Sequence, residues 1–446
     1  MKEYIIHNAL IVNELSVFHG AVHLKEGVIY KIYYNNVFPQ YSGVEYIDAS
    51  QQYLLPGIID DQVHFREPGL THKADFLSES RAAIAGGVTT VMDMPNVNPP
   101  TTSIVALEQK YEMIKNRSFT NYSLYLGATN DNIDEILSLE KGQTCGVKIF
   151  MGSSTGNMLV DNKDTLDKIF SKSKQLIAVH CEDEETIKNN ASLAKEKYGE
   201  DVPISEHPKI RNVEACYKSS SMAVELAMKY NTKLHVLHIT TERELSLFSN
   251  LALGQKNITA EVCVHHLWFT DNDYEKLGSL IKCNPAVKSE TDRNALRMAL
   301  KTNKLDVVAT DHAPHTLQEK ANSYFKSPSG LPLVQHSLQM MMELVNQNII
   351  NIEELVYKMC HAPSLLFAIQ KRGFIREGYF ADIVLLDTNR IYTISKENVL
   401  YKCGWSPLEN STLQSTVTHT WVNGFLVYEH GKPIEDIKGQ RLLFDF

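Results

Sequence analysis

Five polar residues stand in or directly after apolar, β-branched runs, where their side chains could share one site. His64 follows "PGIIDDQV", Lys148 lies in "GVKIFM", His180 lies in "QLIAVHC", His238 lies in "KLHVLHI", and Asp311 follows "LDVVAT". Three imidazoles and a carboxylate are ligands that suit a borderline divalent ion such as zinc. A single His or Asp at such a position is more often structural, so it is the joint placement that indicates a metal centre.

Lys148 is the unusual member of this set, because an ammonium group only donates hydrogen bonds and cannot coordinate a cation. It would have to be neutral and carbamylated by carbon dioxide, which converts the side chain into a carboxylate long enough to bridge two metals. The alternative is a lysine whose stem packs and whose charge stays in water. Because "VKIF" reads as a buried strand, an unpaired charge there would be costly, which favours carbamylation.

The elements that carry these residues alternate between two patterns. Apolar runs typical of buried strands occur at residues 54–60, 88–94, 122–128, 146–151, 175–181, 233–239, 258–264 and 305–311. Amphipathic helical stretches such as "SIVALEQKYEMIKN" and "SSSMAVELAMKY" lie between most of them. Eight strands alternating with helices predict an α/β fold, a (β/α)8 TIM barrel whose C-terminal strand ends carry the active site. A doubly wound open sheet is the alternative, but no Gly-rich phosphate loop follows the first strand.

The sequence pattern at both ends of the chain differs from that of the middle: it predicts short strands separated by turns. We therefore expect residues 1–55 and 378–446 to form one small β-sandwich domain built from both termini, and residues 56–377 to form the barrel with the metal site. Within the C-terminal part, Asn423-Gly424 predicts a tight hairpin turn.

The overall composition narrows the ligand and the compartment. A net charge of -9 with no run of basic residues argues against nucleic-acid binding and favours a small-molecule substrate. Seven scattered cysteines without a C-x-x-C pair are typical of reduced thiols in the cytoplasm. No apolar segment is long enough to be a signal peptide or to span a membrane, so we expect a cytoplasmic protein without a membrane partner.

The ordered motifs resemble a known family. "DDQVHFREPG", "AGGVTTVMDMPNVNPPTT", "VHCED", "HVLHITT", "AEVCVHHL", "CNPAVK" and "ATDHAPH" are similar to the long-form dihydroorotases of the amidohydrolase superfamily, which are related to hydantoinases and allantoinases. The resemblance extends to "REGYFADIVLLD" and "GWSPLEN" near the C-terminus. It implies a zinc-dependent cyclic amidohydrolase that reversibly hydrolyses (S)-dihydroorotate to N-carbamoyl-L-aspartate in pyrimidine biosynthesis. A homodimer is compatible with the resemblance, although no sequence feature demonstrates one.

The resemblance also implies roles for the metal ligands. His64, Lys148 and Asp311 would hold one zinc, and Lys148, His180 and His238 would hold a second, with a hydroxide between the two. Asp311 would be the catalytic base that takes the proton of the attacking hydroxide and then passes it to the leaving nitrogen.

The implied substrate contacts lie in the same motifs. Arg66, Asn96 and His315 would bind the substrate carboxylate, Asn284 would hold the ring, and Gly330 would lie in a loop that lends backbone contacts. Arg66 offers a planar fork that matches a carboxylate, although a salt bridge with Glu67 or Asp75 is the structural alternative. The family more often has Gly and Glu where this chain has Leu333 and Gln335, which puts the role of the Gly330 loop in doubt.

Gln62 is the main departure from the family pattern, which has histidine at this position. An amide oxygen is a weaker zinc ligand than an imidazole. Either Gln62 ligates through oxygen, or water replaces the missing nitrogen, or that site is partly vacant. Two further functions stay open: a hydantoinase- or allantoinase-type amidase, and a non-catalytic scaffold subunit. His235 alternates with His238 along its strand and is expected to face the helices.

Overall fold

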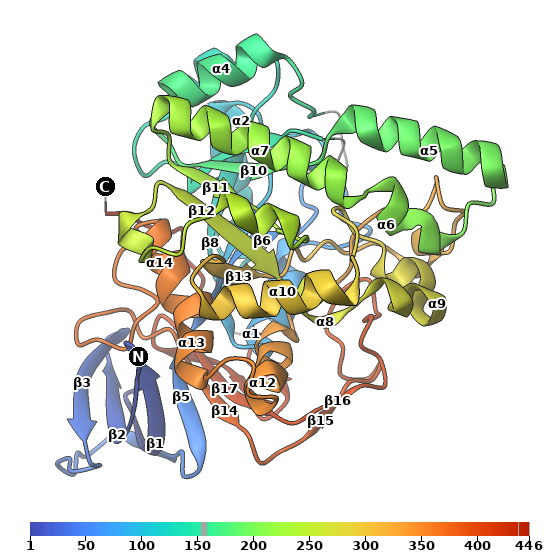
Figure 1. The fold of residues 1–446 in the computed structure, drawn as a ribbon. Helices are drawn as coiled ribbons and strands as arrows, with labels where there is room; N and C mark the ends of the chain where they lie inside the picture. The colour runs from blue at the N-terminus through green and yellow to red at the C-terminus, as the bar shows by residue number, and fades with distance from the viewer. Residues whose placement is uncertain (153–157, 436, 446) are drawn as a thin grey trace.

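The computed structural model describes residues 1–152, 158–435 and 437–445. Eight parallel strands form the central sheet, in the order in which they follow one another along the chain. They are β6 (Ile58–Val63), β7 (Val88–Asp93), β8 (Asn121–Gly127), β9 (Gly146–Phe150), β10 (Ile177–His180), β11 (Leu234–Val236), β12 (Ile258–Cys263) and β13 (Val307–Ala309). The first and last strands meet, because His64 N donates to His312 O at 2.7 Å and the Thr310 hydroxyl donates to Asp60 at 2.6 Å. The predicted (β/α)8 barrel is confirmed (Figure 1).

Helices follow most of these strands on the outside of the barrel. The longer ones are α1 (Phe76–Ala85), α2 (Ile104–Ile114), α4 (Lys163–Lys172), α5 (Glu184–Tyr198), α7 (Val213–Tyr230), α10 (Glu290–Lys301) and α12 (Ser337–Asn346). The shorter ones are α3 (Ile133–Leu137), α6 (His207–Ile210), α8 (Val264–Trp268), α9 (Tyr274–Leu277), α11 (Leu317–Lys320), α13 (Ile352–Val356) and α14 (Ala362–Leu366). Side-chain caps begin many of them; Asp75, for example, forms a capping box with Ser78 at the start of α1.

A second sheet of nine strands joins both ends of the chain. Its strands are β1 (Tyr4–Asn13), β2 (Ser16–Lys25), β3 (Val28–Tyr34), β4 (Glu45–Asp48), β5 (Gln52–Pro56), β14 (Ile383–Asp387), β17 (Thr416–Val422), β18 (Phe425–Glu429) and β19 (Lys432–Pro433), and a separate pair is β15 (Tyr392–Thr393) and β16 (Thr412–Leu413). Antiparallel pairing of β5 with β14 connects the two ends. The expected hairpin is also confirmed: β17 and β18 pair around Asn423 and Gly424, both with positive φ. The boundaries 1–55, 56–377 and 378–446 stay a prediction.

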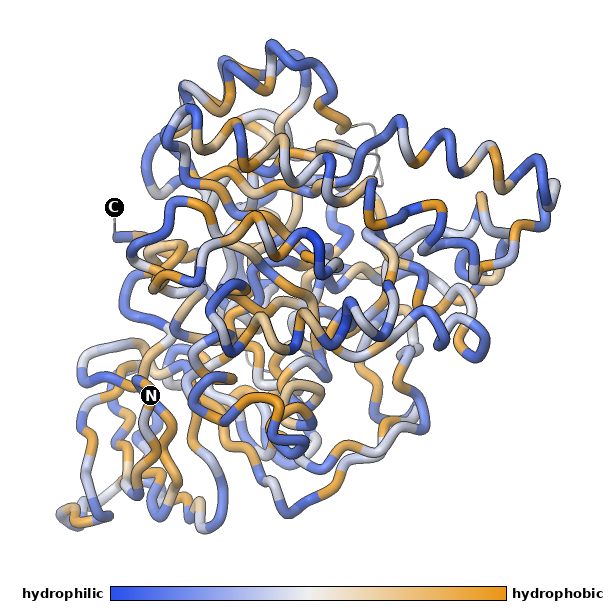
Figure 2. The backbone as a smooth tube through the Cα atoms, viewed as in Figure 1, coloured by the Kyte–Doolittle hydropathy of each residue, from blue (hydrophilic) through white to orange (hydrophobic). Residues whose placement is uncertain are grey.

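The sequence pattern explains which faces are buried. Every residue of β7, β8, β9 and β10 is buried, as expected of parallel strands enclosed by helices. Figure 2 shows the corresponding alternation of apolar and polar residues along outer helices such as α4 and α5. None of the helices in the described ranges is long and apolar enough to cross a membrane.

Candidate active site

The five predicted metal ligands lie at the end of the barrel where the parallel strands terminate. Lys148 is within β9 and His180 is the last residue of β10. His64, His238 and Asp311 come within two residues after β6, β11 and β13. Because all eight strands run in the same direction, these positions share one rim of the barrel.

Four of these side chains form two close pairs. His64 Nε2 lies 3.0 Å from Asp311 Oδ1, and His180 Nδ1 lies 3.0 Å from His238 Nε2. Two nitrogens on one zinc ion are separated by about 3.3 Å, given bonds of about 2.0–2.1 Å and tetrahedral angles. The charge of Lys148 acts on the pKa of Asp311 in one pair and of both histidines in the other. Lys148 is therefore near both pairs, as a bridging ligand must be.

Neighbouring oxygens orient two of the imidazoles. His64 Nδ1 lies 2.8 Å from Asn96 Oδ1, and His180 Nε2 lies 3.2 Å from Glu182 Oε2. Each contact leaves the other ring nitrogen directed toward its partner in the pair. Metal-binding histidines commonly donate their second N–H to such an oxygen.

Two positioning contacts were not anticipated by the sequence analysis. Asn96 uses its side-chain oxygen to orient His64, and its expected contact with the substrate carboxylate stays a prediction. Glu182 was not singled out, although a carboxylate two residues after a strand-end histidine in "VHCED" was an available signal. Burial acts to raise the pKa of Glu182, but Arg211 and His180 lower it to about 2. Glu182 is therefore an anion beside His180.

The protonation states suit metal binding. Burial acts to raise the pKa of Asp311, yet its hydrogen bond with His64 and nearby positive charges hold that pKa below its usual value. Burial lowers the pKa of His180 and takes that of His238 well below the ordinary range. Burial also lowers the pKa of Lys148 to about 8. At neutral pH the carboxylate is ionised and both imidazoles are neutral.

Three buried atoms of this cluster are unsatisfied. Within the described ranges, Lys148 Nζ, His180 Nε2 and His238 Nδ1 have no hydrogen-bond partner, although His180 Nε2 lies within ion-pair distance of Glu182. Leaving such groups buried and unpaired costs free energy. The donor set and the unsatisfied amine thus fit a divalent ion together with a modified lysine.

Gln62 lies near potential metal ligands to which the family resemblance assigns no role. Its side chain is buried, and its Oε1 lies 3.8 Å from Cys263 Sγ on β12. Cys263 forms a buried group with His265 and His266, whose potential ligand atoms lie within 4.8 Å of one another. Burial lowers the pKa of His265 to about 4, so this imidazole is neutral as well.

The expectation that His235 faces the helices is wrong. Its Nε2 lies 3.1 Å from Asp61 Oδ2. Asp61 belongs to β6 and His235 to β11, and these strands are not neighbours in the barrel. The contact therefore crosses the barrel interior. Alternation did not predict it because His238 follows the end of β11, where the strand period no longer applies.

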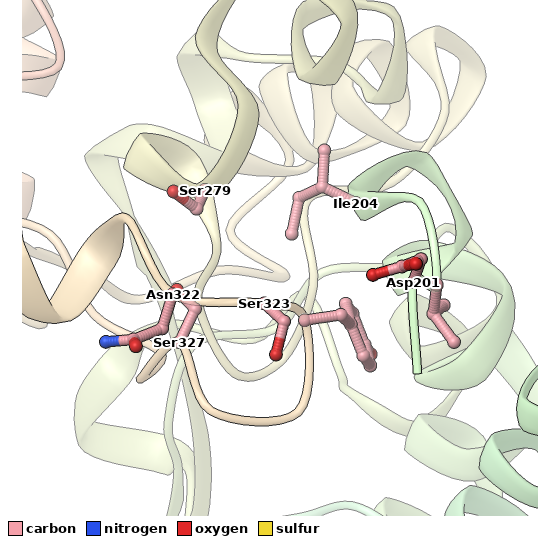
Figure 3. Close-up of a pocket in the computed structure, with 8 residues that line it drawn as sticks. Asp201, Ile204, Ser279, Asn322, Ser323 and Ser327 are labelled. Atoms are coloured by element: carbon pink, nitrogen blue, oxygen red, sulfur yellow. The ribbon is translucent and has the colours of Figure 1, made fainter. Parts of the chain in front are cut away.

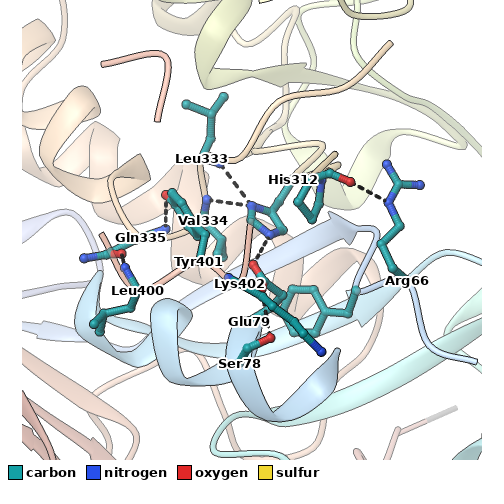
Figure 4. Close-up of polar contacts among 12 residues, drawn as sticks. Arg66, Ser78, Glu79, His312, Leu333, Val334, Gln335, Leu400, Tyr401 and Lys402 are labelled. Atoms are coloured by element: carbon teal, nitrogen blue, oxygen red, sulfur yellow. Dashed lines mark hydrogen bonds and ion pairs between the residues drawn. The ribbon is translucent and has the colours of Figure 1, made fainter. Parts of the chain in front are cut away.

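Arg66 is buried near the strand ends, as a carboxylate-binding group would need to be. It is 1% exposed, its Nε donates to Pro314 O at 3.1 Å (Figure 4), and its Nη2 lies 3.0 Å from His315 Nε2. Its alternative partners are engaged elsewhere: Glu67 pairs with Arg117 at 2.7 Å, and Asp75 pairs with Lys402 at 2.6 Å. In the part of the chain that the structure describes, no carboxylate lies within ion-pair distance of Arg66.

Further positive charge lies beside His315. Lys73 Nζ lies 3.1 Å from His315 Nδ1. Burial, Arg66 and Lys73 together take the pKa of His315 well below its ordinary value, so this imidazole is neutral. Lys73 is a residue that the sequence analysis missed; nothing in its local sequence distinguishes it from a surface lysine.

The segments that contain Asn284 and Gly330 are joined by a backbone hydrogen bond. Gly330 N donates to Lys282 O at 2.8 Å, and Asn284 Oδ1 is buried without a hydrogen-bond partner among the described residues. Gly330 has a φ of +137°, and an added Cβ would lie 2.4 Å from Ala313 O. Only glycine fits this close approach.

The segment after Gly330 is anchored by His312 (Figure 4). Its Nδ1 accepts from Leu333 N at 3.0 Å and Val334 N at 3.3 Å, and its Nε2 lies 2.8 Å from Glu79 Oε2. Gln335 Nε2 donates to Asn398 O at 2.7 Å. Leu333 and Gln335, the departures from the family pattern, thus hold the loop by backbone and amide contacts.

A surface pocket of about 280 Å³ has a different lining (Figure 3). Its polar residues include Asp201, Ser279, Asn322, Ser323 and Ser327. None of the predicted site residues lines it, and its one acidic side chain with hydroxyls and an amide offers no comparable donor set.

The amidohydrolase family model matches residues 53–427. The dihydroorotase of Pyrococcus furiosus is 32% identical over 391 residues, covering 87% of this chain and 85% of the relative. The dihydroorotase of Methanosarcina acetivorans is 32% identical over 422 residues, covering 92% of this chain and 88% of the relative.

Among solved structures, the L-hydantoinase (dihydropyrimidinase) of Arthrobacter aurescens superposes with a TM-score of 0.93 at 25% identity, covering 99% of this chain and 100% of that one. The dihydropyrimidinase of Brevibacillus agri has a TM-score of 0.90 at 23% identity, covering 98% of both chains. This second likeness bears on the fold alone.

Proposed function

Because this chain belongs to the amidohydrolase family, we propose that it is a dihydroorotase, which reversibly hydrolyses the cyclic amide of (S)-dihydroorotate to N-carbamoyl-L-aspartate in pyrimidine biosynthesis. One observation carries the choice of substrate within the family. Arg66 is a buried guanidinium without an acidic partner among the described residues, close to the strand-end cluster. Its full charge is available to an anionic substrate.

The charge of Arg66 separates the two substrate classes. Dihydroorotate carries a carboxylate, whereas a hydantoin ring has none at that position. A buried cation that meets a neutral ring stays unpaired, at a cost of several kcal/mol. Arg66 provides N–H donors for a carboxylate, and the neutral His315 lies directly beside its guanidinium, which favours dihydroorotate.

We propose that His64, Lys148, His180, His238 and Asp311 would hold the metal, with two zinc ions as the expected cofactor and Lys148 in its carbamylated form. Bound there, the metal would supply Lewis-acid chemistry, polarising the scissile carbonyl and lowering the pKa of water from 15.7 toward about 7. Gln62 stands where the first ion lacks an imidazole ligand, and its side-chain oxygen accepts a weak hydrogen bond from Cys263.

Asp311 moves the proton in this proposal. Since its pKa is held below the usual value, it is ionised at neutral pH and accepts the proton of the attacking water. It then donates that proton to the ring nitrogen as the amide bond breaks, and the same steps run in reverse for ring closure. Arg66 and His315 hold the carboxylate, while Asn284 and the backbone near Gly330 contact the ring.

The remaining parts of the proposal concern the whole chain. Residues 56–377 are proposed as the catalytic barrel domain and residues 1–55 with 378–446 as the small sandwich domain. All seven cysteines are free, which supports a reducing compartment such as the cytoplasm. We further propose a small-molecule substrate, no nucleic-acid or membrane partner, and a homodimer.

The experiment compares two substrates in two variants. Purified protein with zinc is assayed for hydrolysis of dihydroorotate and of hydantoin, as wild type, Arg66→Met and Arg66→Lys. Removing one partner of a buried charge pair costs about 2–5 kcal/mol, so kcat/KM for dihydroorotate should fall by about 30- to 5,000-fold in Arg66→Met, with hydantoin use unchanged. Arg66→Lys keeps the charge without the fork and is expected to lie between.

Equal loss on both substrates would contradict the substrate assignment. Preferred turnover of hydantoin by the wild type would support the hydantoinase-type alternative, which the Arthrobacter structure makes the nearest rival. No turnover of either substrate by folded, zinc-loaded protein would support the scaffold alternative.

A further inference from the structure

A second group of potential metal ligands lies inside the barrel. Asp61 of β6, His235 of β11 and Glu261 of β12 are each 0% exposed, and one ligand atom from each lies within 4.8 Å of the others. None of them belongs to the five residues assigned to the strand-end centre. They come from three strands, so any ion between them would connect opposite sides of the barrel.

The imidazole of this group directs one ring nitrogen at the two carboxylates. The Thr259 hydroxyl donates to Leu234 O at 3.1 Å, so it accepts the Nδ1–H of His235, which lies 2.8 Å away. The remaining nitrogen, Nε2, therefore faces the carboxylates. Without a metal it carries a proton, because burial lowers the pKa of His235 but hydrogen bonds and the charges of Asp61 and Glu261 raise it to about 9; a bound ion would replace that proton. Nε2 lies 3.1 Å from Asp61 Oδ2 and 3.8 Å from Glu261 Oε2. This is how a metal-ligating histidine is usually held.

The carboxylates also have unused acceptor capacity. Asp61 Oδ1 and Glu261 Oε2 are buried and have no hydrogen-bond partner in the described ranges. The remaining oxygen of Glu261 is engaged, since Oε1 accepts from His238 N at 3.0 Å. The unsatisfied oxygens belong to side chains that converge on His235.

Two occupants can balance the charge of this space. A proton on Nε2 makes an imidazolium between the two side-chain carboxyl groups, and burial together with Asp61 raises the pKa of Glu261 to about 7, so that a second proton is shared there. A divalent ion with a neutral imidazole balances both carboxylates in their ionised form. The convergence of the three ligand atoms and the two unsatisfied oxygens is what favours the ion.

We propose that Asp61, His235 and Glu261 bind a structural divalent transition-metal ion, separate from the strand-end centre. Two carboxylate oxygens and an imidazole suit zinc or manganese rather than calcium. Bound there, the ion would tie β6, β11 and β12 together. Through Glu261 it would also hold the backbone of His238. Because all three ligands are fully buried, the ion would exchange with solvent slowly.

Crystallography of the zinc-loaded wild-type protein tests the site without any substitution. Anomalous difference maps on the two sides of the zinc absorption edge are expected to show a peak between the three side chains. That peak is resolved from any peak at the strand ends, so this proposal and the proposed function can fail independently. A zinc-loaded crystal with no peak at the triad would overturn the proposal and identify the group as an imidazolium between two carboxylates.

Variants test the same ligands in solution. Zinc per chain is measured by elemental analysis after removal of loosely bound metal, for wild type and for the double variant Asp61→Asn/Glu261→Gln. The double variant is expected to bind one zinc fewer per chain and to lose the part of its thermal stability that depends on zinc. An unchanged zinc count would contradict the proposal, and if the double variant does not fold, the wild-type map decides.

Glu244→Gln is the matched control. Glu244 is also a buried carboxylate, but Ser220 and Thr241 satisfy it with hydrogen bonds of 2.6 and 2.8 Å. Its substitution is expected to leave the zinc count unchanged. Thr259→Val keeps all three ligands but removes the hydroxyl that orients His235 and donates to Leu234 O, and it is expected to weaken zinc binding at the triad by about 10- to 100-fold.

Discussion

Asp311 and His312 are consecutive residues, yet they belong to two very different histidine–carboxylate pairs. Asp311 pairs with His64 at the strand ends, where each side chain is about a tenth exposed. His312 pairs with Glu79 in a fully buried contact, and both ring nitrogens of His312 are hydrogen-bonded. Residues near the first pair keep unsatisfied atoms, such as Lys148 Nζ, whereas the second pair is complete.

The difference between the two pairs separates a reactive site from a structural one. A satisfied buried pair stabilises the fold because removing one partner leaves the other without its hydrogen bond. An unsatisfied cluster costs stability unless a ligand completes it. Two histidine–carboxylate pairs whose members Asp311 and His312 are adjacent in the sequence therefore have opposite effects on stability. Substitutions in the His64–Asp311 pair should change activity, and substitutions in the His312–Glu79 pair should change stability.

The largest effect is expected for Asp311→Asn. An amide cannot accept and return the proton, so kcat for dihydroorotate hydrolysis should fall by about 10²- to 10⁴-fold. Steady-state assays at saturating substrate measure this loss, and thermal unfolding should show a folded protein. Retained kcat would mean that another group carries the proton.

A smaller effect, on stability, is expected for Glu79→Gln. Since His312 Nδ1 accepts two backbone N–H groups, its Nε2 donates to Glu79. The other oxygen of Glu79 accepts from Lys402 N, so an amide with a single acceptor oxygen leaves one donor unpaired. The free energy of unfolding should fall by about 1–3 kcal/mol.

Urea unfolding measures the effect of Glu79→Gln on stability. Activity per folded molecule should stay close to that of the wild type. A large loss of activity at unchanged stability would place this pair with the reactive one.

The third effect concerns carbamylation of Lys148. The neutral amine reacts with carbon dioxide, and burial lowers the pKa of Lys148 to about 8. Its neutral fraction therefore rises from about a tenth at pH 7 to about nine-tenths at pH 9, whereas an exposed lysine stays mostly protonated. At fixed dissolved carbon dioxide, carbamylation of metal-free protein should be about tenfold faster at pH 9.

Carbon-13 NMR with labelled carbon dioxide follows the carbamate of Lys148. Lys148→Arg is the control and should lack the signal. Equal rates at both pH values, or a signal that survives in the variant, would contradict the assignment.

The smallest effect is expected for Gln62→His. An imidazole is a better zinc ligand than an amide oxygen, so zinc affinity at the strand ends should rise by about tenfold. Competition with a chromophoric chelator measures the change, with Gln62→Asn as the control that keeps an amide. Unchanged affinity would mean that Gln62 does not face the metal.

The sequence was sufficient to predict the eight barrel strands and the residues at their ends. Strand periodicity, β-branched runs and intervening amphipathic helices are local properties, and parallel strands bring their C-terminal ends to one rim. His64, Lys148, His180, His238 and Asp311 therefore meet in the structure. Lys73 and Glu79 were missed because their roles depend on contacts made by other segments of the chain, whereas Glu182 contacts His180 two residues away and had a local signal in "VHCED".

The directions of the buried polar side chains depend on tertiary contacts. Between Asp60 and Val63, β6 advances one residue more than its partner β7, and such a bulge interrupts the alternation from which side-chain direction is inferred. Asp61 consequently meets His235, a residue 174 positions away. The same holds for Arg66, whose neighbouring acids pair elsewhere. Residue types and the order of the strands follow directly from the local sequence. Side-chain contacts across the interior of a closed barrel depend on the positions of all its strands.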